Sequence, residues 1–247
     1  FIHEDETVWI ATREGLSIFN PYTEKFANYV HDKSDPNSLS YNLIWNFMRD
    51  KAGNIWIGSF AGGIDIYYPG NSNFTNIGER MGSERLGLNN PVVTSMLEEE
   101  DGGLWVGTNG GGLNYLDRKA GISRYYEVRD NRLKKSNNIV RALAKDNRGN
   151  LWVGTFDGLY RFDKSSVRFD YIKLADAKDS RVISLLEDPD GVWVATVTGG
   201  IQFLGYNGET KIYQADPSRK EALKDNNITV LRRDAQNNIL VGTENGL

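Results

Sequence analysis

A short phrase built around tryptophan returns at regular intervals, and this repetition limits what the chain can fold into. The copies are anchored, in chain order, at Trp9, Trp56, Trp105, Trp152, Trp193 and Leu240. Successive anchors lie 41 to 49 residues apart. Self-similarity with a period of about 40 to 50 residues is typical of a propeller, a solenoid or another repeat array. The chain is therefore expected to be a series of similar structural units.

Each repeat contains four short runs of alternating apolar residues. In the third copy these runs are "PVVTSMLEE", "LWVGT", "GGLNYLD" and "ISRYYEV". Short runs rich in β-branched and aromatic residues, bounded by Gly, Asn and Asp, are typical of β-strands. The spacing of an amphipathic helix does not persist anywhere. Four strands in each repeat match one propeller blade, so the sequence predicts an all-β propeller of four-stranded antiparallel blades.

Glycine and aspartate mark the turns between these runs. The segments "DKAGN" (50–54) and "DNRGN" (146–150) fit a tight turn between the first and second strands, with Gly at a positive φ and Asp capping the turn. A phosphate-binding reading of the glycines is disfavoured, because a strand follows them where a helix N-terminus would be needed. The repeated tryptophan is expected to pack between neighbouring sheets.

Both ends of the chain fall inside a repeat. The opening "FIHED" aligns with the end of the strand "NFMRD", and Leu247 falls where a third strand would open. We therefore expect residues 1–247 to be one propeller segment, truncated at both ends, with about five blades and part of another. A ring of seven such blades would need roughly 330 residues.

Composition excludes several classes of function. The net charge of −4 gives no general attraction to nucleic acid or to an anionic membrane, and the lack of cysteine excludes disulfides and thiol chemistry. The two histidines, His3 and His31, have no partner at a metal-ligand spacing. The acidic runs 98–101 and 187–190 recur in turns, which favours capping. We expect no catalytic residue, metal or cofactor.

Five stretches carry a family resemblance. They are "FANY" (26–29), "SLSYN" (38–42), "DKAGNIWIGSFAGGI" (50–64), "DGGLWVGTNGGGL" (101–113) and "DNRGNLWVGTFDGL" (146–159). Their pattern resembles the two-component regulator propeller repeat, and the resemblance extends over essentially the whole chain.

The resemblance implies a function as well as a fold. Propellers of this family form the extracytoplasmic sensor region of hybrid two-component systems typical of Bacteroidetes, and many of those sensors detect oligosaccharides. It implies a periplasmic, ligand-sensing region of a homodimer, tethered to the membrane and joined to a histidine kinase through regions outside this chain. Two alternatives remain open: a non-signalling surface or scaffold propeller that binds glycan or protein, and a propeller lyase or glycosidase.

Ligands of propellers usually meet the loops at one rim, so the variable loops are the candidate site. The turn between the second and third strands changes from copy to copy. Phe60 and Phe156 could stack on a sugar ring, while Arg13, Asn109 and Asp157 could bond its hydroxyl groups. In the alternative interpretation, both phenylalanines pack between blades.

Two further sets of residues are candidates. Trp45 and Arg141 occupy the same place in the first strand, five residues before the turn aspartate, and they would line a channel if that place faces one. The long polar linkers carry cations that could bind an acidic glycan or simply stand in solvent: Arg80, Arg85, Arg132, Lys134 and Lys135.

Overall fold

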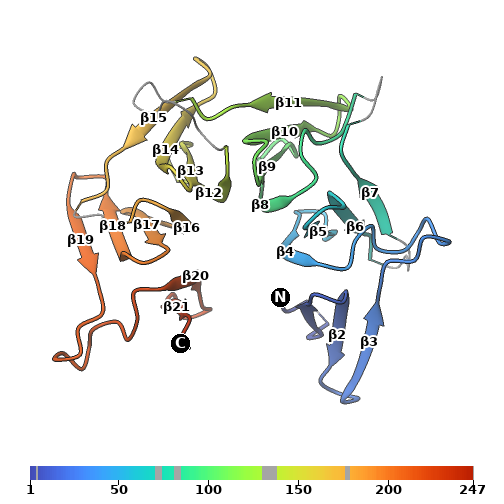
Figure 1. The fold of residues 1–247 in the computed structure, drawn as a ribbon, viewed down its shortest axis with the longest axis horizontal. Coiled ribbons are helices and arrows are strands. Elements are labelled where there is room, and N and C mark those ends of the chain that lie inside the picture. The colour runs from blue at the N-terminus through green and yellow to red at the C-terminus, as the bar shows by residue number, and fades with distance from the viewer. Residues whose placement is uncertain (4, 70–73, 81–84, 130–137, 176–178, 247) are drawn as a thin grey trace. The chain divides into compact units, whose positions relative to one another are not determined.

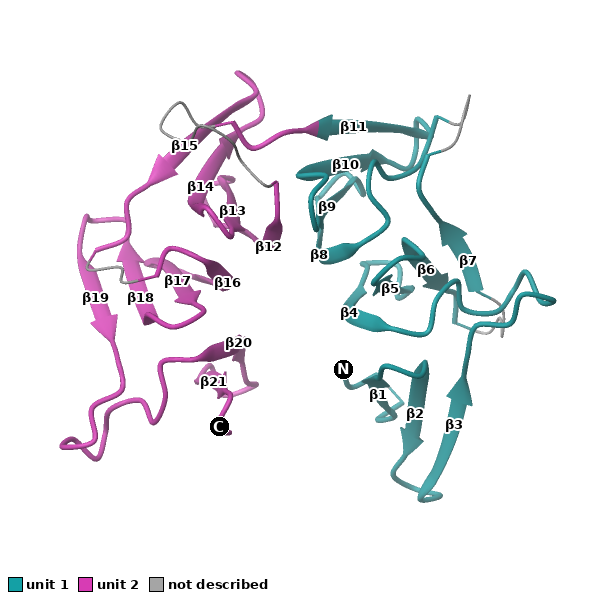
Figure 2. Cartoon of the chain, viewed as in Figure 1, with its two compact units in different colours: residues 1–125 teal, residues 126–247 magenta. Residues whose placement is uncertain are grey.

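The fold consists of small antiparallel sheets. The computed structural model describes residues 1–3, 5–69, 74–80, 85–129, 138–175 and 179–246, and these residues form 21 strands and no helix. The chain divides into two compact units, residues 1–125 and 126–247, which Figure 2 colours separately. The prediction that residues 1–247 make one propeller segment stays a prediction.

The first unit holds three sheets, and Figure 1 labels their strands other than β1. The first sheet contains β1 (Val8–Ala11), β2 (Leu16–Asn20) and β3 (Lys25–Tyr29). The second contains β4 (Ile44–Arg49), β5 (Ile55–Ser59), β6 (Ile64–Tyr67) and β7 (Phe74–Ile77). The third contains β8 (Val93–Glu98), β9 (Leu104–Thr108), β10 (Leu113–Asp117) and β11 (Ile122–Tyr126).

The second unit also holds three sheets. The fourth sheet contains β12 (Val140–Lys145), β13 (Leu151–Thr155), β14 (Gly158–Asp163) and β15 (Arg168–Ile172). The fifth contains β16 (Val182–Asp188), β17 (Gly191–Thr196), β18 (Gly200–Gly205) and β19 (Thr210–Tyr213). The sixth contains β20 (Ile228–Arg233) and β21 (Ile239–Thr243).

Strands pair in sequence order within each sheet, and every pair is antiparallel. Four sheets have four strands, which confirms the predicted blade. The first sheet differs from the prediction at the start of the chain. Phe1 and Trp9 exchange backbone hydrogen bonds of 3.1 and 2.8 Å, and among the described residues before β1 the pairing is a single bridge, Ile2 with Val8, in place of a strand. His3, expected in a strand, lies outside the strands and bonds Asp5.

The core lies between consecutive sheets. In the first unit, one cluster joins Trp9 and Leu16 to Ile55 and Ile57 of the second sheet. The others pair the second with the third sheet, the fourth with the fifth, and the fifth with the sixth. Burial of aromatic and branched side chains removes apolar surface from water and supplies most of the stabilisation. The expectation that the tryptophan packs between sheets is confirmed at Trp9, where the side chain is 4% exposed.

The turn between the first and second strands is capped by its aspartate, as expected. In the second sheet, the Asp50 carboxylate accepts hydrogen bonds from the backbone N–H of Ala52 and Asn54 at 3.0 and 2.9 Å. Its second oxygen accepts the indole N–H of Trp56 at 2.9 Å. Asp146 makes the equivalent bonds in the fourth sheet. One carboxylate therefore fixes both the turn and the tryptophan.

Candidate functional site

Each sheet has two ends with different chemistry. We call the end that carries the Asp-capped turn the turn end, and the opposite end the loop end. At the loop end, the residue after the second strand donates its backbone N–H to a carbonyl just before the first strand. These pairs are Phe60 with Leu43, Asn109 with Val92, Phe156 with Ile139, Val197 with Arg181, and Glu244 with Asn227, at 2.9 to 3.1 Å. In these five sheets the linker before the first strand and the turn after the second strand therefore meet at the loop end.

The first strand carries a β-bulge near the loop end. Five sheets show the same register shift, and the extra residue is Trp45 in β4, Thr94 in β8, Arg141 in β12, Ile183 in β16 and Thr229 in β20. A bulge turns a side chain away from the alternation of the strand and is common beside binding sites. Trp45 and Arg141, which the sequence analysis selected as channel-lining candidates, are thus the bulge residues of their strands.

In the second sheet, the bulge residue meets the variable turn. The ring centres of Trp45 and Phe60 lie 5.5 Å apart, and those of Tyr41 and Phe60 lie 6.4 Å apart. Phe60 is 37% exposed and Tyr41 is 39% exposed. We call Tyr41, Trp45 and Phe60 the aromatic group. Tyr41 was missed by the sequence reasoning, although it lies within the quoted "SLSYN".

In the fourth sheet, the same two places hold a different pair. The Arg141 guanidinium lies 5.5 Å from the centre of the Phe156 ring, a cation–π contact. Burial lowers the pKa of Arg141, which nevertheless keeps its charge at neutral pH. Phe156 is half-buried, and the neighbouring Asp157 donates its backbone N–H to Thr155 Oγ1 at 3.0 Å.

The remaining sequence candidates are dispersed. Arg13 is exposed and lines a hollow of ≈ 540 Å³ beside β2, and Asn109 is half-buried at the loop end of the third sheet. Neither belongs to the aromatic group. Arg80 and Arg85 are exposed, as the solvated interpretation expects. Arg132, Lys134 and Lys135 lie outside the described residues.

A hollow of ≈ 570 Å³ opens beside the aromatic group in the first unit. We call it the loop-end hollow. Its lining residues are Ser40, Ala61, Gly62, Asn76, Ile77, Gly78, Glu79, Leu86 and Pro91. Asp65 is fully buried nearby and accepts hydrogen bonds from Ser40 N at 3.0 Å, Ser40 Oγ at 2.9 Å and Asn76 Nδ2 at 3.1 Å. Burial raises the pKa of Asp65. The buried Asp65 carboxylate therefore fixes two residues of the wall, Ser40 and Asn76.

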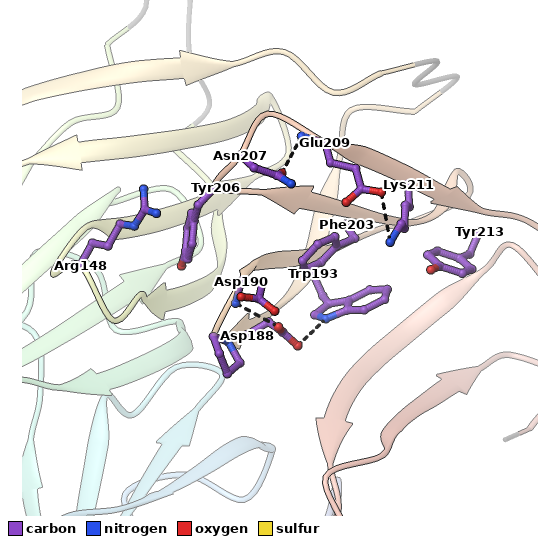
Figure 3. Close-up of a pocket in the computed structure, with 11 residues that line it drawn as sticks. Arg148, Asp188, Asp190, Trp193, Phe203, Tyr206, Asn207, Glu209, Lys211 and Tyr213 are labelled. Atoms are coloured by element: carbon purple, nitrogen blue, oxygen red, sulfur yellow. Dashed lines mark hydrogen bonds and ion pairs between the residues drawn. The ribbon is translucent and has the colours of Figure 1, made fainter.

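A second pocket, of ≈ 470 Å³, lies in the second unit and is drawn in Figure 3. Its aromatic wall brings Trp193 within 4.8 Å of Phe203 and 5.5 Å of Tyr213, measured between ring centres. Lys211 and Glu209 form an ion pair of 3.1 Å at its edge. The sequence reasoning missed Phe203 and Tyr213, whose signal is the alternation of apolar residues in the third and fourth strands.

The second pocket is lined by residues of the repeated framework. Its walls include Trp193 and Asp188, and the indole N–H of Trp193 donates a hydrogen bond of 3.1 Å to Asp188 Oδ2. In the second sheet, the equivalent Trp56 is covered by Arg118, which follows the third strand of the next sheet and stacks 4.8 Å from the Trp56 ring centre. The variable loop end therefore remains the better candidate for ligand binding.

Two kinds of feature are absent from the described residues. Within the ranges given above, no three His, Asp or Glu side chains are grouped so that they could hold a metal ion. In the same part of the chain, no helix is long and apolar enough to cross a bilayer.

The repeat matches a known family, and its fold matches a solved sensor. The model of the family "two component regulator propeller" matches residues 38–61, 87–110 and 134–157. The extracellular domain of a putative hybrid two component system from B. thetaiotaomicron superposes on 96% of this chain, with a TM-score of 0.80 and 25% identity. The chain carries repeats of the two-component regulator propeller family. Its sheets are therefore propeller blades.

Two further proteins place this two-component regulator propeller among its relatives. It is 30% identical over 196 residues to "Histidine kinase P4" of Formosa agariphila. Virginiamycin B lyase from Staphylococcus aureus shares the fold, with a TM-score of 0.70 and 17% identity over 100% of this chain and 76% of the lyase. The match to the Formosa protein covers 75% of this chain but 14% of that protein. The match to the B. thetaiotaomicron domain covers 30% of that domain. It thus corresponds to a small part of its sensor relatives.

Proposed function

We propose that this chain is a ligand-sensing propeller segment in the extracytoplasmic region of a hybrid two-component regulator, and that its ligand is an oligosaccharide. The observation that carries the proposal is the match over 96% of the chain to the extracellular domain of a putative hybrid system. The relative from Formosa agariphila is named a histidine kinase, which agrees with a signalling role.

The loop end supplies the chemistry of recognition. The backbone hydrogen bond between the two loop sets recurs from sheet to sheet, whereas the side chains that stand on it differ. In the second and fourth sheets, these side chains are the pairs Trp45–Phe60 and Arg141–Phe156. Aromatic faces beside polar groups suit a sugar ring, because its C–H face stacks and its hydroxyl groups form hydrogen bonds.

Signalling follows from rigid sheets. A packed blade does not deform continuously, so bound ligand would favour one arrangement of domains over another through its different affinity for the two. We propose that this shift occurs in a periplasmic homodimer and reaches a histidine kinase across the membrane. The propeller segment itself would have no catalytic activity.

The test is ligand-dependent phosphorylation of the full-length protein in membrane vesicles. Vesicles would be supplied with ATP and with a panel of neutral and acidic oligosaccharides, and phosphate incorporation would be measured. We expect one glycan class to change the rate of incorporation, and the same glycan to raise the melting temperature of the extracellular region, because a ligand that binds the native state stabilises it.

Two other results would contradict the proposal. If a glycan raises the melting temperature but never changes phosphate incorporation, the propeller is a glycan-binding scaffold. If mass spectrometry shows that a bound glycan is cleaved, the propeller is a lyase or a glycosidase.

A further inference from the structure

The aromatic group and the loop-end hollow are parts of one continuous surface. Phe60 precedes Ala61 and Gly62, and Tyr41 follows Ser40, while Ala61, Gly62 and Ser40 line the hollow. A Cβ atom on Gly62 would lie 2.3 Å from Ser40 Oγ and 2.9 Å from Tyr41 Cβ. The Ser40 and Tyr41 side chains therefore pack against Gly62, and the aromatic group borders the loop-end hollow.

Two rings of the aromatic group, Phe60 and Tyr41, are open to solvent. Phe60 is in contact with rings on two sides, Trp45 and Tyr41, which hold its orientation. Because Phe60 and Tyr41 each remain more than a third exposed, a ligand can reach both rings. Stacking of a flat face on pre-oriented aromatic rings costs little conformational entropy.

The hollow offers hydroxyl-binding groups and negative charge. Ser40 Oγ, Asn76 Oδ1 and the Glu79 carboxylate supply acceptors, because the Ser40 hydroxyl and the Asn76 amide N–H groups already donate within the protein. The nine described lining residues include no Lys or Arg. The carboxyl group of Asp65 lies buried against Ser40 and Asn76 and positions both of them. An anionic ligand would be repelled by Glu79, whereas a neutral sugar loses nothing electrostatically and gains hydrogen bonds.

We propose that the aromatic group and the loop-end hollow form a two-part site for a neutral oligosaccharide. One ring stacks on Phe60 and Tyr41, and the hydroxyl groups of the adjoining ring bond Ser40, Asn76 and Glu79 in the hollow. This inference rests on the proposed function and narrows it to one sheet and one class of glycan. In the fourth sheet, by contrast, the Arg141 guanidinium already stacks on the equivalent ring, Phe156.

The test is isothermal titration calorimetry on the full-length protein in detergent. The probes are a panel of neutral oligosaccharides of two to six sugars, and the uronic-acid counterparts of those that bind. Phe60→Ala is expected to weaken binding of the neutral ligand about tenfold or more, which corresponds to about 1.4 kcal/mol. Phe60→Tyr keeps the ring and is expected to bind within about twofold of the wild type.

Two control variants test whether the change in binding comes from the aromatic group and the loop-end hollow. Phe26→Ala removes another exposed phenylalanine, which lies on β3 away from the loop end, and should leave binding unchanged. Glu79→Gln keeps a hydrogen-bonding group in the hollow but removes its charge, so it should let the uronic-acid ligand bind more tightly than it binds the wild type. Melting temperatures of every variant show whether a loss of binding is a loss of folding.

The outcomes separate the inference from the proposed function. If a neutral glycan binds and signals but Phe60→Ala changes nothing, the sensor stands and this site is wrong. If acidic glycans bind preferentially and Phe156→Ala abolishes that binding, the ligand class and the sheet are both wrong. If no oligosaccharide binds and none changes phosphorylation, the proposed function fails and this inference fails with it.

Discussion

The indole N–H of Trp56 donates a hydrogen bond of 2.9 Å to Asp50 Oδ2, and both side chains are buried. The same oxygen accepts a charged hydrogen bond of 3.0 Å from Arg118 of the next sheet. Arg118 also stacks on the Trp56 ring. Asp50 thus connects its own turn, its own core residue and the neighbouring sheet through one carboxylate.

Removal of this carboxylate should destabilise the protein strongly. Asp50→Ala leaves the buried indole N–H of Trp56 and the Arg118 guanidinium without their acceptor, and such losses cost about 3 kcal/mol in the free energy of unfolding. Denaturant unfolding of the variant measures it. Asp234→Ala is the matched control, because Asp234 caps its turn in the same way while Leu240 takes the place of the tryptophan. There we expect a clearly smaller loss, because no buried indole N–H depends on Asp234. Equal losses in the two variants would show that the turn alone sets the cost.

The glycine in the middle of the second strand is required by the next sheet. A Cβ on Gly154 would lie 2.5 Å from Val182 Cγ1. Gly154→Ala is therefore expected to lower the free energy of unfolding by about 1 to 3 kcal/mol. The fifth sheet carries Ala195 at this place, fully buried, so the constraint depends on the facing side chain. The double variant Gly154→Ala with Val182→Ala should lose less than the sum of the two single variants. Strict additivity of the two would refute the proposed overlap.

Acid should weaken the loop end of the fifth sheet through Asp179. The Arg181 guanidinium forms two hydrogen bonds of 2.9 and 2.8 Å with this carboxylate, and Thr198 Oγ1 adds a third at 2.8 Å. The bonds from Arg181 lower the pKa of Asp179 to about 2. A depressed pKa in the folded state gives stability that is present above the ordinary value of 3.8 and is lost as the pH falls towards 2.

Asp179→Asn tests this directly. The wild type should be more stable than the variant by about 1 to 2 kcal/mol at pH 7, after allowance for the half-exposed Arg181. The difference should shrink as the pH falls below about 4, and urea unfolding at several pH values measures it. A difference that stays constant down to pH 2 would rule out titration of Asp179 as its source.

Asp65 should respond to pH in the opposite direction. Burial raises its pKa, so the charged form is penalised in the folded state near neutral pH. In the third sheet, Asn114 stands at the same place and accepts a hydrogen bond of 3.1 Å from Asn89 N, as Asp65 does from Ser40 N.

Asp65→Asn is therefore expected to be tolerated, with a melting temperature at pH 7 close to that of the wild type. Relative to this variant, the wild type should gain stability as the pH falls through the raised pKa, down to about 3.8. Asp65→Ala should instead cost about 2 kcal/mol, because Ser40 N and Asn76 Nδ2 lose their acceptor. Thermal unfolding between pH 4 and pH 8 gives both comparisons, and a stable Asp65→Ala variant would show that the carboxylate does not hold the linker.

Periodicity was sufficient to predict the sheets because the residues that fix them repeat. Trp56 and Asp50 belong to one local segment, six residues apart, and their hydrogen bond forms within one hairpin. The bulge was beyond such reasoning. One extra residue at Trp45 changes the face of every residue beyond it, and alternation alone cannot show where the extra residue lies. The aligned repeats did contain a signal for the bulge. Ile44 and Val140, at one aligned position, are both branched apolar residues, whereas Trp45 and Arg141, at the next position, differ in chemical type.

The hollow and its buried acid could not be predicted for a different reason. Asp65 reads in sequence as a surface residue of a strand, but its partner Ser40 lies 25 residues earlier in a linker without regular pattern. The contact depends on how that linker closes over the third strand, which is a tertiary property. The only clue was the recurrence of a polar residue at this place, as Asn114 and Gln202.

In the second, fourth and fifth sheets the bulge and the Asp–Trp bond lie at opposite ends, and this separation has a consequence for how such proteins diversify. The bulge residue and the Asp–Trp bond use different side chains, so the residue at the bulge can change while the turn and its tryptophan stay bonded. A gene that duplicates one repeat thus inherits a sheet that already folds, with its ligand contacts open to selection. Binding of a new compound can be acquired one sheet at a time, while the remaining sheets keep their original preference.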